Sequence, residues 1–190
     1  MSSLYSLYNW DIMKSKFATF VSYIFPFLLV ITLIIAINNI IELIMLAVVP
    51  CIIWLISAKL SGQNWDIEDR NHRLIPLIIL TIYGVVISFI FNDLFSKAFL
   101  INIIFILIIT LFWKISMHCY GLSTLIMLLM YLLKYTNNNY YLIISLIISY
   151  SVFLILTIWS RLYLKKHTVL QVVIGTFSGF LVNLIMLKFV

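Results

Sequence analysis

Seven runs of apolar residues take up most of the chain, and each is about as long as a helix that crosses a lipid bilayer. Such a helix needs about 20 residues. Because the runs are continuous and do not alternate between apolar and polar residues, they predict helices and not the strands of a membrane barrel. The runs cover residues 17–36, 40–58, 75–92, 98–115, 119–134, 141–160 and 168–188.

The composition excludes a soluble fold. The chain is 65% hydrophobic and 9% charged, whereas a soluble domain is about 25% charged. We therefore predict an all-α, polytopic integral membrane bundle with six to seven transmembrane helices, since the run 119–134 is short. Residues 1–16 are polar and aromatic, which favours an interfacial segment, and residues 17–190 would form a single transmembrane domain.

The basic residues favour one side of the membrane. With seven spans, nine cations fall on the side of the amino terminus and three on the other. Cytoplasmic loops carry the excess of Lys and Arg, so the amino-terminal side is expected to be cytoplasmic. A nucleic-acid partner is not expected despite the net charge of +6, because the few cations lie at the ends of apolar runs.

Three polar segments interrupt the apolar chain: 64–76 ("NWDIEDRNHRLIP"), 113–118 ("WKISMH") and 160–175 ("SRLYLKKHTVLQVVIG"). Two predicted spans separate each segment from the next. All three should therefore face the same side of the membrane, where they can form one composite site.

The polar segments carry arginines and histidines of the kind that handle phosphate. Guanidinium groups bind phosphate oxygens with paired hydrogen bonds, and two histidines can act as nucleophile and general acid. No Asp or Glu follows Asp93. A magnesium site usually takes carboxylates from more than one segment, so we expect neither a metal nor another cofactor.

Three short motifs resemble those of the type-2 phosphatidic acid phosphatase superfamily, which includes the lipid phosphate phosphatases and the vanadium haloperoxidases. The family pattern S-R-x5-H-x3-D is matched by Ser160, Arg161 and His167. The pattern P-S-G-H is matched in part by "ISMH", which keeps Ser116 and His118. Of K-x6-R-P, Arg73 remains, and Pro76 follows it at a distance. The resemblance covers about residues 59–180.

The resemblance implies a role for each matching residue. His167 would attack phosphorus and form a phosphohistidine, and His118 would protonate the leaving oxygen. Arg73 and Arg161 would bind the phosphate oxygens, and Ser116 would add a hydrogen bond.

The chain departs from the family pattern at three positions. Asp66 stands where the family has its first-motif Lys, so Lys114 and Arg70 are candidate replacements as phosphate ligands. Met117 replaces the Gly of the second motif. Gln171 replaces the Asp that orients the nucleophilic His; an amide can accept an N–H bond but brings no charge.

The leading hypothesis is a metal-independent phosphatase of membrane lipids, acting on a phosphate monoester or a polyprenyl (di)phosphate. A first alternative is a weak or inactive phosphatase-like protein that binds or moves lipid phosphates. A second is a magnesium-dependent prenyl transferase, suggested by "DIEDR" at 66–70, although the second half of the chain has no matching acidic motif.

Overall fold

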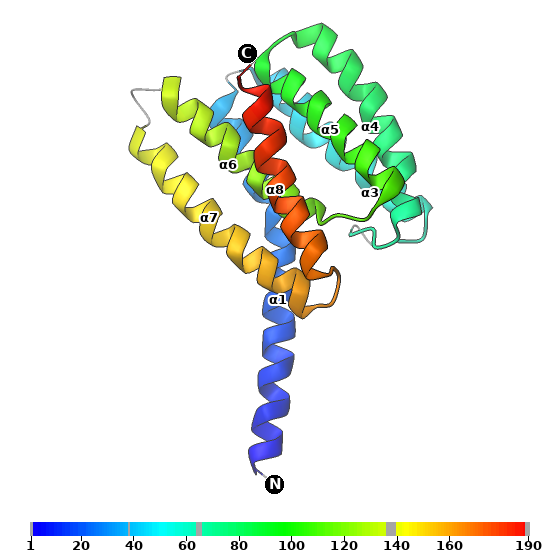
Figure 1. Ribbon diagram of the computed structural model, residues 1–190, viewed down its shortest axis with the longest axis vertical. Coiled ribbons are helices and arrows are strands. Elements are labelled where there is room, and N and C mark those ends of the chain that lie inside the picture. Colours follow the sequence, from blue (N-terminus) through cyan, green and yellow to red (C-terminus); the bar gives the residue numbers. More distant parts are fainter. Residues whose placement is uncertain (1, 38, 64–65, 136–139, 189–190) are drawn as a thin grey trace. The chain divides into compact units, whose positions relative to one another are not determined.

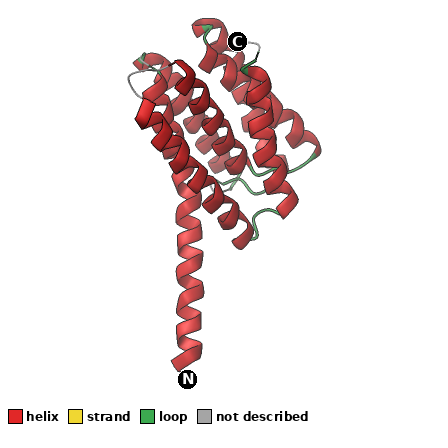
Figure 2. Cartoon of the chain, turned by 60° about the vertical axis from the view of Figure 1, so that its left-hand side comes forward, coloured by secondary structure: helices red, strands yellow, loops and turns green. Residues whose placement is uncertain are grey.

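The fold is helical throughout the part of the chain that the structure describes. In the computed structural model this part comprises residues 2–37, 39–63, 66–135 and 140–188. All of its regular structure is helix (Figure 2). Within these residues seven helical segments are long and apolar enough to cross a membrane, which confirms the predicted all-α membrane fold.

The helices follow the predicted apolar runs closely (Figure 1). The second span is built from three consecutive pieces, α2, the π-helix η1 and α3. The bounds are α1 Ser2–Ala36, α2 Ile40–Leu43, η1 Ile44–Val48, α3 Val49–Leu60, α4 Arg70–Phe91, α5 Leu94–Phe112, α6 Met117–Tyr135, α7 Tyr140–Tyr163 and α8 Val169–Met186. A turn expected at the asparagines 137–139, and residues 64–65 of the first polar segment, lie outside the described residues.

Short polar side chains explain where several helices begin and end. The carboxylate of Asp69 accepts from the N–H of Asn71 at 2.9 Å and starts α4. Asp93 and Ser96 form a capping box at the start of α5. Asn92 ends α4 in the left-handed conformation, with φ of 49°. These caps satisfy backbone groups that a helix end leaves without partners.

The chain divides into two compact units. The first unit holds residues 1–28 and 116–180, and the second holds 29–115 and 181–190. The boundary therefore falls inside α1 and again inside α8. Each unit has its own packing and polar contacts.

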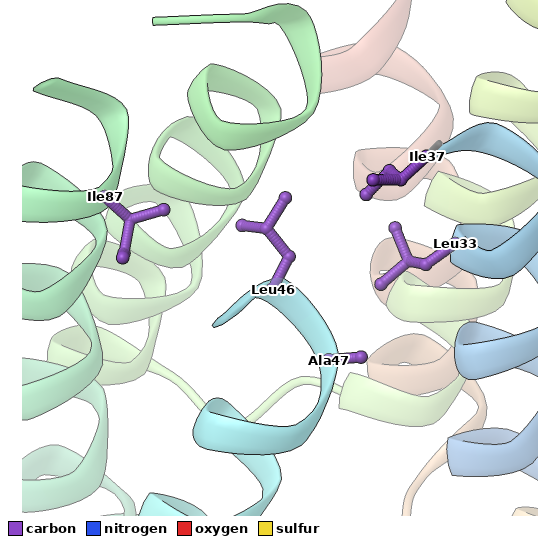
Figure 3. Close-up of a cluster of buried hydrophobic side chains, with 5 residues drawn as sticks. All are labelled: Leu33, Ile37, Leu46, Ala47 and Ile87. Carbon is purple, nitrogen blue, oxygen red and sulfur yellow. The ribbon is translucent and has the colours of Figure 1, made fainter. Parts of the chain in front are cut away.

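In the second unit, the end of α1 packs against the π-helix η1. Figure 3 shows the buried cluster that results, formed by Leu33, Ile37, Leu46, Ala47 and Ile87. The Tyr83 hydroxyl donates to the carbonyl of Met45, inside η1, at 2.7 Å. Deeper in the same unit, the amides of Asn102 and Asn183 donate to each other at 3.0 Å in both directions.

In the first unit, α1 and α7 run antiparallel. The carbonyls of Asp11, Ala18 and Leu28 accept from the side chains of Tyr163, Ser160 and Tyr150, at 3.4, 2.6 and 2.8 Å. The partner numbers on α7 fall as those on α1 rise, which is the pairing of antiparallel helices (Figure 1). The amino-terminal stretch therefore lies at the same end of this unit as the loop after α7.

Candidate functional site

The candidate residues are divided between the two units. The first unit contains Ser116, His118, Arg161, His167 and Gln171, and the second contains Arg70, Arg73 and Lys114. Within the first unit the motif residues come from the start of α6, the end of α7 and the start of α8. All three positions are helix ends, as the sequence predicted for a site at the membrane boundary.

Ser116 joins the second and third motifs. Its N–H donates to the carbonyl of Gln171 at 3.2 Å, while its own carbonyl accepts from the N–H of Tyr120 at 3.0 Å. The residue is completely buried, and the Cys119 thiol lies beside its hydroxyl, which makes no fully formed hydrogen bond in the described part of the chain. The backbone of Ser116 is thus held in place, and its hydroxyl can bind a polar group that enters the site.

Two glycines of α8 allow this close contact with α6. A Cβ atom at Gly175 would lie 2.8 Å from the carbonyl oxygen of Ser116, and one at Gly179 would collide with the carbonyl of Tyr120. Both glycines therefore serve close packing of the two helices. Glycine at 175 therefore fixes how near Ser116 can come to the first turns of α8.

His167 lies just before α8 and is held by Gln171. The ring nitrogen Nδ1 lies 3.2 Å from Oε1 of Gln171, and the same oxygen accepts from the N–H of Thr168 at 3.2 Å. The N–H of Gln171 in turn donates to the Thr168 hydroxyl at 3.4 Å. Thr168 and Gln171 thus form a reciprocal capping box, and the sequence expectation that Gln171 reaches the imidazole is met.

The imidazole tautomer follows from this contact. An amide oxygen only accepts hydrogen bonds, so Nδ1 of His167 carries the proton. In the neutral ring the lone pair then belongs to Nε2, which is the nitrogen a nucleophilic His would use. His167 is itself buried.

Arg161 is the most deeply buried charged residue of the first unit, with 1% of its surface exposed. Its Nη1 lies 3.5 Å from the hydroxyl of Ser22 in α1. The guanidinium also lies close enough to Cys119 for an electrostatic interaction. Since Cys119 follows His118 directly, Arg161 belongs to the same end of the unit as the α6 motif.

The loop after α7 turns the chain from Arg161 to His167. The N–H of Lys166 donates to the carbonyl of Arg161 at 3.1 Å, and Lys165 adopts a left-handed conformation with φ of 54°. This αL turn ends α7 in the way that helices commonly end. The side chain of Lys165 is exposed, whereas Arg161 and His167 on either side of the turn are buried.

Ser22 was not predicted from the sequence. It is buried, and its hydroxyl lies 2.9 Å from that of Ser160. The only sequence signal is a small polar residue inside the first apolar run, and such residues are common in spans. The resemblance to the phosphatase family begins near residue 59 and gave no reason to consider α1.

In the second unit, arginines join the first and second polar segments. Arg73 is buried and donates to the carbonyls of Ile67 at 2.6 Å and Ile115 at 3.3 Å. Arg70, which is less buried, donates to the carbonyl of Phe112 at 2.8 Å. The two segments therefore lie at the same end of this unit. The sequence predicts that the site with the two histidines also includes Arg70, Arg73 and Lys114. This stays a prediction.

No group of three His, Cys, Asp or Glu is placed to hold a metal ion among the described residues. The comparisons with known proteins add no relatives. No family model, curated protein or solved structure matches the chain.

Proposed function

We propose that the chain is an integral membrane lipid phosphatase, a divergent relative of the type-2 phosphatidic acid phosphatases. Its substrate is a lipid phosphate monoester or a polyprenyl (di)phosphate, and the reaction proceeds through a phosphohistidine. The lipid tail stays in the bilayer while the phosphate enters the polar end of the first unit.

One observation carries the proposal. Gln171 contacts Ser116 through its carbonyl and His167 through its side chain, so residues of two separate motifs meet in the first unit. A capping box alone would account for Gln171 and Thr168. It would not account for the buried Ser116 hydroxyl or for the burial of two histidines and an arginine at the same end.

The mechanism follows from the donors and acceptors present. Nε2 of His167 attacks phosphorus, the bond from phosphorus to the leaving oxygen breaks, and His118 gives that oxygen a proton. Arg161 and Ser116 stabilise the charge on the transferring phosphoryl group. Water then attacks the phosphohistidine, the P–N bond breaks, and the water proton passes to His118. Both residues return to their starting states.

A second candidate is a protein that binds lipid phosphates without turning them over. The observation in its favour is Gln171, whose neutral amide cannot stabilise a positively charged His167 as a carboxylate would. This candidate retains the phosphate-binding role of Arg161 and Ser116 and removes the nucleophilic role of His167.

The test is phosphate release by purified protein from phosphatidate, phosphatidylglycerol phosphate and a polyprenyl diphosphate, each with EDTA present. We expect EDTA-resistant turnover of at least one substrate, with a radiolabelled phosphoprotein that is stable in base and labile in acid. His167→Ala should abolish both turnover and label. His72→Ala is the matched control, since His72 lies in the second unit at a position that no motif specifies.

The alternatives give different results in the same assay. Binding of a lipid phosphate without release would support the second candidate. Release of diphosphate from the polyprenyl substrate that needs Mg²⁺ and is lost in EDTA would support the prenyl transferase reading suggested by the sequence "DIEDR". Wild-type rates in both His167→Ala and His118→Ala would contradict the phosphatase proposal.

A further inference from the structure

A buried chain of hydrogen bonds connects Arg161 to the first span. Nη1 of Arg161 lies 3.5 Å from the Ser22 hydroxyl, which lies 2.9 Å from the Ser160 hydroxyl, and that hydroxyl donates to the Ala18 carbonyl at 2.6 Å. The four residues are at least 95% buried. In apolar surroundings such bonds are stronger than in water, and breaking one is correspondingly costly.

The chemistry of the groups fixes the direction of this chain. A guanidinium can only donate, so Ser22 Oγ accepts from Arg161. A carbonyl can only accept, so the proton of Ser160 points to Ala18. The proton of Ser22 then points to Ser160 Oγ, or to the Ala18 carbonyl at 3.2 Å. When the Ser22 proton points to Ser160, each hydroxyl both donates and accepts, and the chain ends on a backbone atom of α1.

We propose that Ser22 is a positioning residue for Arg161, and that α1 is therefore part of the phosphate-binding machinery. This inference rests on the proposed function for the role of Arg161 itself. A guanidinium is planar, with five N–H donors in a rigid fork. Holding Nη1 against Ser22 restricts the orientation of the whole group, and so restricts the direction in which it meets a phosphate.

The proposal assigns a role to Ser160 as well. Ser160 belongs to the motif that resembles the phosphatase family, yet its hydroxyl is engaged with Ala18 and Ser22. It acts through Ser22 and has no need to touch the phosphate. Loss of either hydroxyl interrupts the same chain.

The experiment measures kcat and KM for Ser22→Ala, with the member of the lipid phosphate panel that the wild type hydrolyses fastest. We expect kcat to fall about tenfold, the effect of losing one hydrogen bond to a charged group, with KM nearly unchanged. Ser22→Thr keeps the hydroxyl and should restore most of the rate. Thr19→Ala is the matched control, because the Thr19 hydroxyl is on the same helix, exposed, and bonded to the carbonyl of Ser15.

A role of Ser22 in stability alone would give a different pattern of kcat values in double variants. In an Arg161→Lys background, Ser22→Ala should cause little further loss of kcat, because the group it positions has already been replaced. An equal fold-loss in both backgrounds would overturn the proposal. So would a Ser22→Ala enzyme that behaves like Thr19→Ala.

The inference can fail separately from the proposed function. If the wild type releases no phosphate from any substrate, the phosphatase proposal fails. The Ser22–Arg161 contact is then tested by melting temperatures in detergent, measured for Ser22→Ala, Arg161→Lys and the double variant. Non-additive shifts support the positioning contact even then. Additive shifts overturn it, whatever the activity of the chain.

Discussion

At the scale of single residues, the amide oxygen of Gln171 serves two groups at once. It accepts from the backbone of Thr168, which starts α8, and it contacts the imidazole of His167. One side chain therefore sets both the beginning of the helix and the tautomer of the expected nucleophile. An amide does this without adding charge.

Replacing Gln171 by an acid should increase activity. Gln171→Glu keeps the length of the side chain and both contacts, and its charge stabilises the cationic form that His167 passes through. In a serine protease, exchange between Asp and its amide changes kcat by about 10⁴. We expect a smaller rise, about tenfold, in kcat measured at pH 7.

The control for this prediction is Gln171→Met. The Met side chain has a similar length but cannot accept a hydrogen bond from the imidazole N–H as the amide oxygen does. This variant should lose most activity. If the Glu and Met variants have the same rate, the contact between residue 171 and the imidazole has no role in turnover.

The basic residues around the α7–α8 loop should differ in their salt dependence. Arg161 is buried and Lys165 is exposed. Arg161→Ala should lower kcat by about 10²–10³ at any ionic strength, as loss of a group that stabilises the transition state does. Lys165→Ala/Lys166→Ala removes a surface attraction of about 1 kcal/mol per cation, which salt screens.

Steady-state rates at 20 mM and 500 mM NaCl distinguish the two variants. The lysine pair should raise KM at low salt and have little effect at high salt. A lysine variant as damaged as Arg161→Ala at high salt would show that the assignment of roles in this loop is wrong.

At the scale of helices, the glycines of α8 set the distance between α6 and the start of α8. Gly175→Ala would place a methyl group 2.8 Å from the Ser116 carbonyl oxygen, which is backbone and cannot swing aside. We expect a lower melting temperature in detergent and a loss of kcat, because Ser116 is displaced.

Val173→Ala is the matched control on the same helix, since Val173 is 54% exposed on the surface of the structure. It should alter the melting temperature much less than Gly175→Ala. Equal kcat and equal melting temperatures in the two variants would contradict the role given to Gly175.

The helices were largely predictable from the sequence, and the contacts between them only in part. Long apolar runs predict spans because the bilayer sets their length. The sequence also placed Gln171 next to His167, but on the basis of a shared helix face, whereas His167 precedes α8 and the contact arises from the cap at the start of that helix. Nothing local predicts that Ser22 contacts Ser160, since this depends on the register of α1 against α7. The continuous helix from Ser2 through residue 16 was also not expected from the polar composition of that stretch.

At the scale of the whole molecule, the distribution of cations predicts the orientation in the membrane. We propose that the end carrying Lys165 faces the cytoplasm. Lys165→Cys should react with a membrane-impermeant maleimide in inverted vesicles and not in intact cells. Cys51 and Cys119 are replaced by serine in this background.

Lys97→Cys tests the opposite face of the membrane. Lys97 is exposed, and the seven-span arrangement places it on the side away from Lys165. The substituted cysteine should be labelled in intact cells. Labelling of both positions from the same side would contradict the seven-span topology, and a complete reversal would contradict only its orientation.

The hydrogen bond between Ser22 and Ser160 also has a consequence for biosynthesis. The two residues are 138 positions apart, and a ribosome adds about 5–20 residues per second, so α1 enters the membrane about 7–30 seconds before its partner is made. During that time the Ser22 hydroxyl can donate to the carbonyl of Ala18 in its own helix, which lies 3.2 Å from it in the finished protein. The first span can thus wait in lipid without an unsatisfied polar group, and the proposed phosphate-binding end of the first unit is completed only after α7 has been synthesised.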